Sequence, residues 1–241
     1  MGELDSVRAK TARAITHLDA LDLQCRDFRA SRPYVLSFET EPQTGDQLVR
    51  VTGTPVTPPV MPVIGDILSN FRSALDHLAH QLVMKAGNVP TNRTYFPIFN
   101  SSARYEKESP AQTKGMTQPM IDLIRYHQPC FGQNQYANRS LWALQEYGNI
   151  AKHRRLLTVV SATGGTLWDP PGASAYVHEG PVEDGTILAR FPADHHKGSI
   201  SSVPTIAFGE GAAKGEDIQR VLGLLKLRIP RIVNEFEAAF F

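Results

Sequence analysis

The polar residues between Pro59 and Gly87 offer the clearest candidate chemistry in the chain. Arg72, Asp76 and His80 follow one another at i, i+4 spacing, which places their side chains along one face of a helix. A carboxylate in the middle of such a row can hold a guanidinium on one side and an imidazole on the other. This arrangement is typical of general acid–base chemistry.

A second polar face lies on the helix expected from Arg139 to His153. Glu146, Asn149 and His153 stand at i, i+3 and i+7, so they share one side of that helix. If the two helices are antiparallel neighbours, their polar faces meet in one cleft. The residues expected to lie close together are Asp76, His80, Glu146, Asn149 and His153. A polar network that fixes the helix register, or a plain solvated face, would give the same pattern.

The same residue types allow a metal-binding interpretation. Carboxylate and imidazole side chains from facing bundle helices are common ligands of zinc and iron. The four side chains that would supply the ligands are Asp76, His80, Glu146 and His153. The chain contains neither an HExxH motif nor a paired Glu-x-x-His motif. Chemistry without a metal or any other cofactor is therefore the preferred prediction.

The segment Arg72–His77, with the sequence RSALDH, resembles the Arg-x4-His motif of the HEPN (higher eukaryotes and prokaryotes nucleotide-binding) superfamily. This superfamily consists of helical bundles, many of which are dimeric ribonucleases. The resemblance implies that Arg72 stabilises the phosphorane, that His77 serves as acid or base, and that the RNA 2′-OH is the nucleophile. Ser73 stands where the family commonly has Asn, Asp or His.

The spacing of this motif bears on the oligomeric state. Five residues turn a helix by about 140°, so Arg72 and His77 point to different sides of the same helix. The resemblance implies a site completed across a two-fold interface, where Arg72 of one chain approaches His77 of its partner. A homodimeric ribonuclease or RNA-binding protein is therefore expected. A non-catalytic helical interaction or structural protein is the alternative.

Three segments taken together, FRSALDHLAHQL, FPIF and NIAKHRRLL, resemble a family of uncharacterised bacterial proteins, many of them actinobacterial. That resemblance implies no function. A serine or cysteine hydrolase is less favoured, because the chain has no GxSxG motif and Cys130 lies in no known nucleophile signature.

The helices that must position these residues are amphipathic. Apolar and small residues recur at spacings of three and four from Leu4 to Phe28 and from Ile64 to Leu82, so each segment predicts a helix with one buried stripe. Arg139 to His153 and Glu216 to Phe240 complete a bundle of about four main helices. The first stripe is expected to pack on the second, the alternative being a self-associating coiled coil.

Short β-branched segments predict a small antiparallel sheet, with a hairpin within 34–54 and further strands within 156–208. The sequence leaves open whether the hairpin joins the later strands or stands apart as a flap. The segment Val89–Gln118 is expected to be irregular, with Tyr95–Phe99 as a buried apolar anchor. The expected fold is a single α+β domain over residues 1–241. Its helical parts are residues 1–31, 60–87, 119–155 and 215–241.

The composition narrows the class of protein. Hydrophobic residues make up 41% and charged residues 20% of the chain, which argues against disorder and against a membrane protein. The net charge of +1 is much lower than that of a strongly basic nucleic-acid-binding protein. Two cysteines are too few for a disulfide framework, and the N-terminal segment has no apolar core of a signal peptide. A cytoplasmic protein without a membrane partner is expected.

Overall fold

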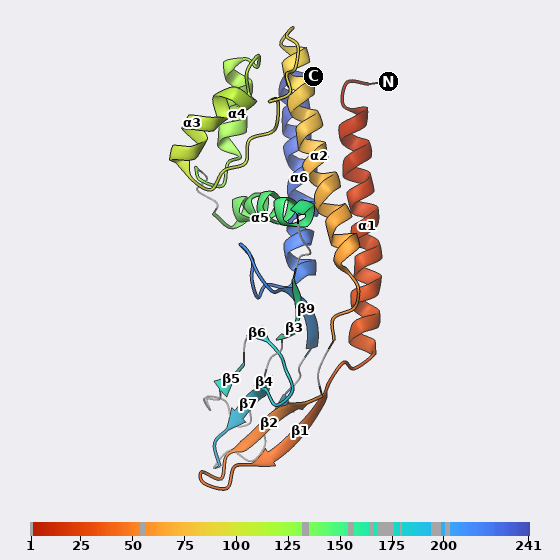
Figure 1. Ribbon diagram of the computed structural model, residues 1–241, viewed down its shortest axis with the longest axis vertical. Helices are drawn as coiled ribbons and strands as arrows, with labels where there is room; N and C mark the ends of the chain where they lie inside the picture. Colours follow the sequence, from red (N-terminus) through yellow and green to blue (C-terminus); the bar gives the residue numbers. More distant parts are fainter. Residues whose placement is uncertain are drawn as a thin grey trace. The chain divides into compact units, whose positions relative to one another are not determined.

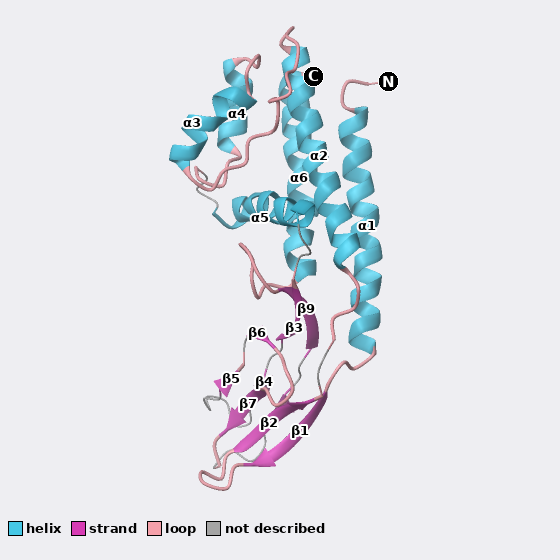
Figure 2. Cartoon of the chain, viewed as in Figure 1, coloured by secondary structure: helices cyan, strands magenta, loops and turns pink. Residues whose placement is uncertain are grey.

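The computed structural model describes residues 2–53, 56–131, 135–153, 157–163, 166–167, 176–178, 180–193, 199–200 and 203–241. Within these residues the chain forms six helices and nine strands, which confirms the predicted α+β class (Figures 1 and 2). Parts of the predicted β region, among them residues 168–175 and 194–198, lie outside the described residues.

The contacts within the chain divide it into two compact units. The helical unit contains Met1–Leu21, Met61–Leu156 and Gln219–Phe241, and the β-rich unit contains Asp22–Val60 and Leu157–Ile218. Each unit is therefore built from segments that are distant in the sequence. The single domain expected over residues 1–241 stays a prediction.

Three long helices form the frame of the helical unit: α1 (Asp5–Ala30), α2 (Met61–Lys85) and α6 (Ile218–Phe240). Arg8, near the start of α1, pairs with Glu237, near the end of α6. Further along the same two helices, Nζ of Lys226 lies 2.9 Å from Oδ1 of Asp19. The helices α1 and α6 therefore run antiparallel and side by side, as Figure 1 shows.

The predicted stripe of α1 is buried throughout its length. The sequence predicts that this stripe packs on the stripe from Ile64 to Leu82, the alternative being a coiled coil with a second copy. The buried residues of this stripe are Leu4, Val7, Thr11, Ala14, Leu18, Leu21, Cys25 and Phe28. Because the chain itself covers all of them, packing inside the chain is favoured over a coiled coil, whereas packing on the stripe from Ile64 to Leu82 stays a prediction.

Helix α2 owes its length to a broad apolar face and ends at a glycine. Its predicted stripe is fully buried, and the stripe is widened by Ile67, Ala74, Ala79 and Val83. Gly87 follows the helix with a φ of +79°, a conformation that glycine adopts without strain. The Asn88 amide donates to the Val83 carbonyl at 3.1 Å, which completes a Schellman cap.

No described helix combines the length and apolar content needed to cross a bilayer.

The segment expected to be irregular contains a helix, so that prediction was wrong in part. Helix α3 (Ser102–Gln112) begins after Ser101, whose side chain accepts a hydrogen bond from the Arg104 amide. Only Tyr105 and Ser109 of α3 are buried, so it has little of the apolar periodicity that reveals a helix. The remaining helices are α4 (Gln118–Tyr126) and α5 (Gln135–His153).

The strands of the β-rich unit form antiparallel sheets. The predicted hairpin consists of β1 (Val35–Thr40) and β2 (Gln47–Thr52), and β2 also pairs with β7 (Ile187–Phe191). The early hairpin therefore joins later strands and is not a separate flap. The four-stranded sheet has the order β1-β2-β7-β5, where β5 is Tyr176–Val177.

Two smaller groups of strands complete this unit within the described residues. The first is a three-stranded sheet of β6 (Gly180–Pro181), β3 (Thr158–Thr163) and β9 (Val203–Phe208), in that order. The second is the pair β4 (Thr166–Leu167) and β8 (Ser199–Ile200). The predicted single sheet is thus replaced by several small ones.

Candidate functional site

Arg72 and Asp76 of α2 form a two-point ion pair. Nη2 of Arg72 donates to Oδ1 of Asp76 at 2.7 Å, and Nε donates to Oδ2 at 3.1 Å. The pairing follows from the i, i+4 spacing, which places both side chains on one helical face. Their side chains are only 14% and 21% exposed, so water screens the attraction less than at an open surface.

Two further contacts fix the Arg72 guanidinium. Nη1 donates to the side-chain oxygen of Gln145 in α5 at 2.9 Å, and Nη2 donates to the carbonyl oxygen of Phe96 at 2.8 Å. Oδ1 of Asp76 also accepts the Phe96 amide at 3.1 Å. Arg72 therefore uses four of its five N–H donors inside the chain. Its main observed role is to tie α2, α5 and the segment at Phe96 together.

The segment Phe96–Phe99, which we call the strap, is buried although it belongs to no strand. Buried backbone groups need hydrogen-bond partners, and here side chains supply them. Arg72 and Asp76 hold the backbone of Phe96. Gln128 donates to the Pro97 carbonyl at 2.8 Å and accepts the Phe99 amide at 3.1 Å. The strap is therefore clamped at both ends.

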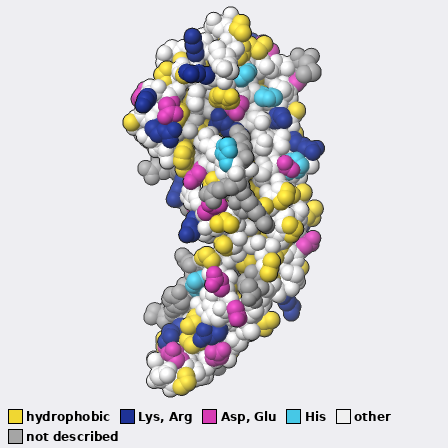
Figure 3. Space-filling view, viewed as in Figure 1, with side chains coloured by type: hydrophobic (Ala, Val, Ile, Leu, Met, Phe, Trp, Pro, Cys, Tyr) yellow, Lys and Arg dark blue, Asp and Glu magenta, His cyan; other side chains and the backbone are white. Residues whose placement is uncertain are grey.

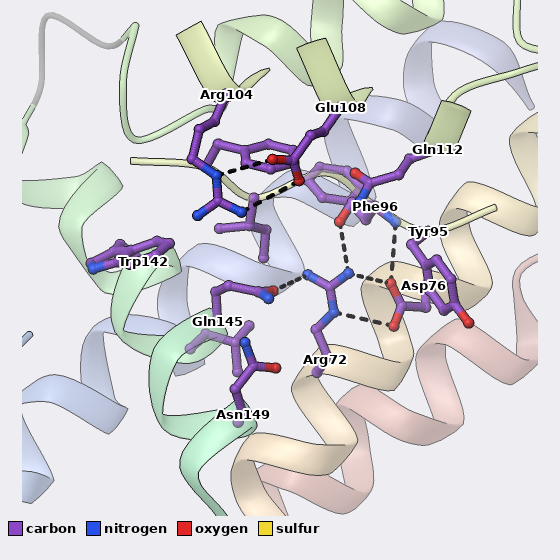
Figure 4. Close-up of a pocket in the computed structure, with 14 residues that line it drawn as sticks. Arg72, Asp76, Tyr95, Phe96, Arg104, Glu108, Gln112, Trp142, Gln145 and Asn149 are labelled. Atoms are coloured by element: carbon purple, nitrogen blue, oxygen red, sulfur yellow. Dashed lines mark hydrogen bonds and ion pairs between the residues drawn. The ribbon is translucent and has the colours of Figure 1, made fainter. Parts of the chain in front are cut away.

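A cavity of about 300 Å³ lies beside Arg72, enclosed by α2, α3, α5 and the strap (Figure 4). Its volume is near the lower end of the range for small-molecule pockets. Aromatic side chains line part of the wall, and carboxamide side chains supply further polar groups. The aromatic residues are Tyr95, Phe96, Phe99 and Trp142, and the carboxamide residues are Gln112, Gln145 and Asn149.

A second arginine–carboxylate pair lines the cavity. Arg104 of α3 donates to Glu108 from Nε at 3.1 Å and from Nη2 at 3.3 Å, again at i, i+4 spacing. The side chains are 60% and 41% exposed, so this pair meets solvent. The hydrogen bond to Glu108 raises the pKa of Arg104 above its ordinary value. The Arg104 guanidinium also lies over the Phe99 ring, 5.7 Å from its centroid.

The carboxamides give the cavity both donors and acceptors. Oε1 of Gln112 is buried and has no hydrogen-bond partner among the described residues. Because the Arg72 guanidinium can only donate, it holds the oxygen of Gln145 and leaves the Gln145 amide N–H groups as donors. Asn149 is exposed and can both donate and accept.

The lining of the cavity supplies aromatic surface and hydrogen-bonding groups. Among the described residues that line the cavity there is no Ser, Thr, Cys, His or Lys, so the common nucleophiles are missing there. Both lining carboxylates, Asp76 and Glu108, are already bonded to arginines. The cavity is suited to a planar ligand that stacks on aromatic rings and hydrogen-bonds to carboxamides.

The sequence-predicted residues divide into two groups. Arg72, Asp76 and Asn149 line the cavity. His77 is half-buried and His80 is exposed, with Nε2 of His80 3.1 Å from the Thr94 carbonyl oxygen. Neither histidine lines the cavity.

On the other polar face, Glu146 is half-buried and His153 is exposed, and neither lines the cavity. Of the five residues expected to meet, the cavity therefore brings together only Asp76 and Asn149. The metal-binding alternative used Asp76, His80, Glu146 and His153. No group of three or more His, Cys, Asp or Glu side chains in the described part of the chain could hold a metal ion. The four residues of the metal-binding alternative therefore form no such group in the structure.

Several cavity residues escaped the sequence analysis. Arg104, Glu108 and Gln112 lie on α3, in the segment expected to be irregular, although the Arg104–Glu108 spacing was a usable signal for a helix. Gln145 is not among the predicted site residues, whereas its neighbour Glu146 is. Its role depends on the rotation of α5 about its own axis, which the sequence pattern alone does not fix.

A buried polar cluster lies elsewhere in the helical unit. His127 is fully buried, its Nδ1 is 3.0 Å from Nη2 of Arg228, and its Nε2 is 3.1 Å from Oε2 of Glu235. Burial lowers the pKa of His127 from 6.5 to about 4, helped by the charge of Arg228 and opposed by that of Glu235. The ring of Phe236 contacts both His127 and Phe96, so the cluster packs behind the strap.

Comparison with known proteins adds no relative. No family model matches the chain, and neither a curated protein nor a solved structure does.

Proposed function

We propose that this protein binds single-stranded RNA and that the cavity beside Arg72 holds one unstacked base. The observation that carries the proposal is the convergence of aromatic and carboxamide side chains in one cavity of about 300 Å³. Proteins that read single-stranded RNA stack its bases on aromatic rings and hydrogen-bond to the base edges. Trp142 and Tyr95 offer the faces, and Gln112, Gln145 and Asn149 offer the polar groups.

The charge distribution supports recognition of a base over tracking of the phosphate backbone. The net charge is only +1. Among the described residues on the face shown in Figure 3, Lys and Arg side chains are mixed with Asp and Glu and form no continuous basic stripe. Non-specific binding to the backbone relies on such a stripe. Affinity for RNA therefore has to come largely from contacts with the base.

Fluorescence anisotropy with labelled, mixed-sequence, single-stranded RNA tests this function. The parent should bind, and Trp142→Ala should weaken binding roughly tenfold, because stacking of one base contributes about 1–3 kcal/mol. Gln145→Ala should also weaken binding. The matched control is Gln118→Ala, which removes the same side chain from an exposed position on α4. Absence of binding by the parent, or equal loss in the control, would overturn the proposal.

A second candidate function is metal-independent RNA cleavage of the HEPN type. It is favoured by the half-buried imidazole of His77, which has no hydrogen-bond partner among the described residues and is thus available as an acid or base. Arg72 of a partner chain would complete the site in a homodimer, after release from Asp76. RNA cleavage in EDTA that leaves 2′,3′-cyclic phosphate ends and is lost in His77→Ala supports this candidate. If light scattering shows a monomer and no RNA is cleaved, this second candidate function is contradicted.

We propose that the protein performs this function in the cytoplasm. RNA is present there, and the two cysteines, Cys25 and Cys130, are free thiols, as a reducing compartment keeps them. Separation of cell fractions with an antibody to the protein tests this location.

A further inference from the structure

The two arginine–carboxylate pairs of the cavity share one spacing and differ in how firmly they are held. Arg72 reaches three partners and its side chain is 14% exposed. The Arg104 guanidinium donates to Glu108 alone among the described residues, and its side chain is 60% exposed. An exposed pair with a single partner is weak, because water and salt screen its charges. Arg104 is therefore the arginine that can change partners.

We propose that Arg104 exchanges Glu108 for a terminal phosphate of the bound RNA, so that the edge of the cavity is a phosphate subsite and Glu108 is its gate. This inference rests on the RNA-binding function proposed above. It adds Arg104 as the residue that binds the phosphate of the nucleotide whose base lies in the cavity. A ribonucleotide monophosphate is the smallest ligand that fills both the base cavity and the subsite.

The exchange is favoured by charge and by shape. A terminal phosphate carries a charge of about −1.5 to −2 at neutral pH, whereas the Glu108 carboxylate carries one. The planar guanidinium donates two parallel hydrogen bonds to a phosphate as readily as to a carboxylate. Arg72 cannot compete for the phosphate, because Asp76 already neutralises it and most of its donors are engaged. In Figure 4 the Arg104–Glu108 pair lies above Arg72, and no dashed line joins the two arginine–carboxylate pairs.

The Phe99 ring keeps Arg104 in place when its hydrogen bonds to Glu108 are broken. The guanidinium carbon lies 5.7 Å from the ring centroid, within the range of a cation–π contact. The ring itself is buried and packs edge-to-face on Tyr105, with the two ring centroids 6.1 Å apart. The strap therefore supplies the phosphate subsite with a platform that does not depend on the gate.

Binding of nucleosides is compared with binding of nucleotides to test the subsite. The probes are the four ribonucleosides, their 5′-monophosphates and their 3′-monophosphates, titrated by isothermal calorimetry. In the parent, one of the two phosphate positions should improve affinity about tenfold over the nucleoside, as expected for a hydrogen bond to a charged group. In Arg104→Gln that gain should be lost, so that nucleoside and monophosphate bind this variant with equal affinity. Glu108→Gln should increase the gain.

The neighbouring pair of Arg125 and Glu106 is the matched control. It joins α4 to α3, is also exposed, and does not line the cavity. Glu106→Gln should leave both affinities at the parent value. Nucleosides that bind while neither monophosphate binds more tightly, or a phosphate gain that survives Arg104→Gln, would overturn the phosphate subsite and leave base binding standing. If neither nucleosides nor single-stranded RNA bind, the proposed function falls and the subsite falls with it.

Discussion

The side-chain oxygen of Gln145 lies 2.9 Å from Nη1 of Arg72, although the two residues are 73 positions apart in the sequence. This contact joins α5 to α2 at the wall of the cavity. Arg72 also holds the strap through the Phe96 carbonyl. One guanidinium therefore sets the relative positions of three parts of the cavity wall.

Loss of Arg72 should destabilise the fold. Arg72→Ala leaves the Asp76 carboxylate and the Phe96 carbonyl without their charged donor, which should lower the free energy of unfolding by about 2–4 kcal/mol. Arg72→Lys keeps the charge and should still destabilise, because an ammonium cannot reproduce the fork geometry. Urea unfolding followed by circular dichroism measures both. Arg8→Ala, in the exposed pair with Glu237, is the control and should cost no more than about 1 kcal/mol.

Gln128 should prove essential for the strap. Gln128→Leu fills a similar volume but leaves the Pro97 carbonyl and the Phe99 amide unpaired and buried, a loss of about 1–3 kcal/mol. Hydrogen exchange at the Phe99 amide should accelerate in the variant, since that amide loses its acceptor. Gln118→Leu at the start of α4, the helix that precedes Gln128, changes an exposed residue and should affect neither quantity. Unchanged exchange at Phe99 in Gln128→Leu would show that another group holds the strap.

The buried His127 should make stability fall as the medium becomes acidic. In the folded protein the pKa of His127 is about 4, whereas the ordinary value is 6.5. Between these pH values the unfolded chain binds a proton that the folded chain does not, so lowering the pH from 6.5 towards 4 favours unfolding. The expected loss is up to about 1.4 kcal/mol per pH unit.

The variants His127→Gln and His127→Phe isolate this contribution from that of the carboxylates. The free energy of unfolding of the parent and of each variant should be measured at several pH values between 7 and 4. The parent should lose more stability than either variant over this window. Parallel curves would mean that His127 does not keep its low pKa in the folded protein.

The two thiols should react with alkylating agents at different rates. Burial, with the charge of Asp217, raises the pKa of Cys25 to about 12, and its side chain is hidden from solvent. Burial also raises the pKa of Cys130, but that residue is partly exposed. Iodoacetamide should therefore modify Cys130 first, and Cys25 only on unfolding, because the reaction needs an accessible thiolate. Mass spectrometry of digested samples measures the order, and equal rates would contradict it.

Local periodicity explains which parts of the fold could be predicted. The stripe from Leu4 to Phe28 and the hairpin around Gly45 are encoded by neighbouring residues, and both were found. Helix α3 was missed because most of its residues are polar and only two are buried. Its Ser101 cap is a short-range signal that a run of polar residues conceals.

In the candidate site, contacts within one helix could be predicted from the sequence, whereas contacts between helices could not. Arg72 and Asp76 pair through their i, i+4 spacing, which the sequence displays. Which residues of α5 face them depends on how that helix is rotated against α2. The structure turns Gln145 and Asn149 towards the cavity, while Glu146 and His153 do not line it. That rotation follows from packing of the buried residues Leu141, Leu144 and Tyr147, which is a tertiary effect.

The antiparallel pairing of α1 with α6 also has a consequence for the order of events during translation. The contact between Arg8 and Glu237 spans 229 positions, so α1 leaves the ribosome long before its partner exists. At a translation rate of about 5–20 residues per second, the delay is roughly 11 to 46 s. For that time the apolar stripe of α1 has no α6 to cover it, and a nascent chain with such a stripe is a natural client for chaperones.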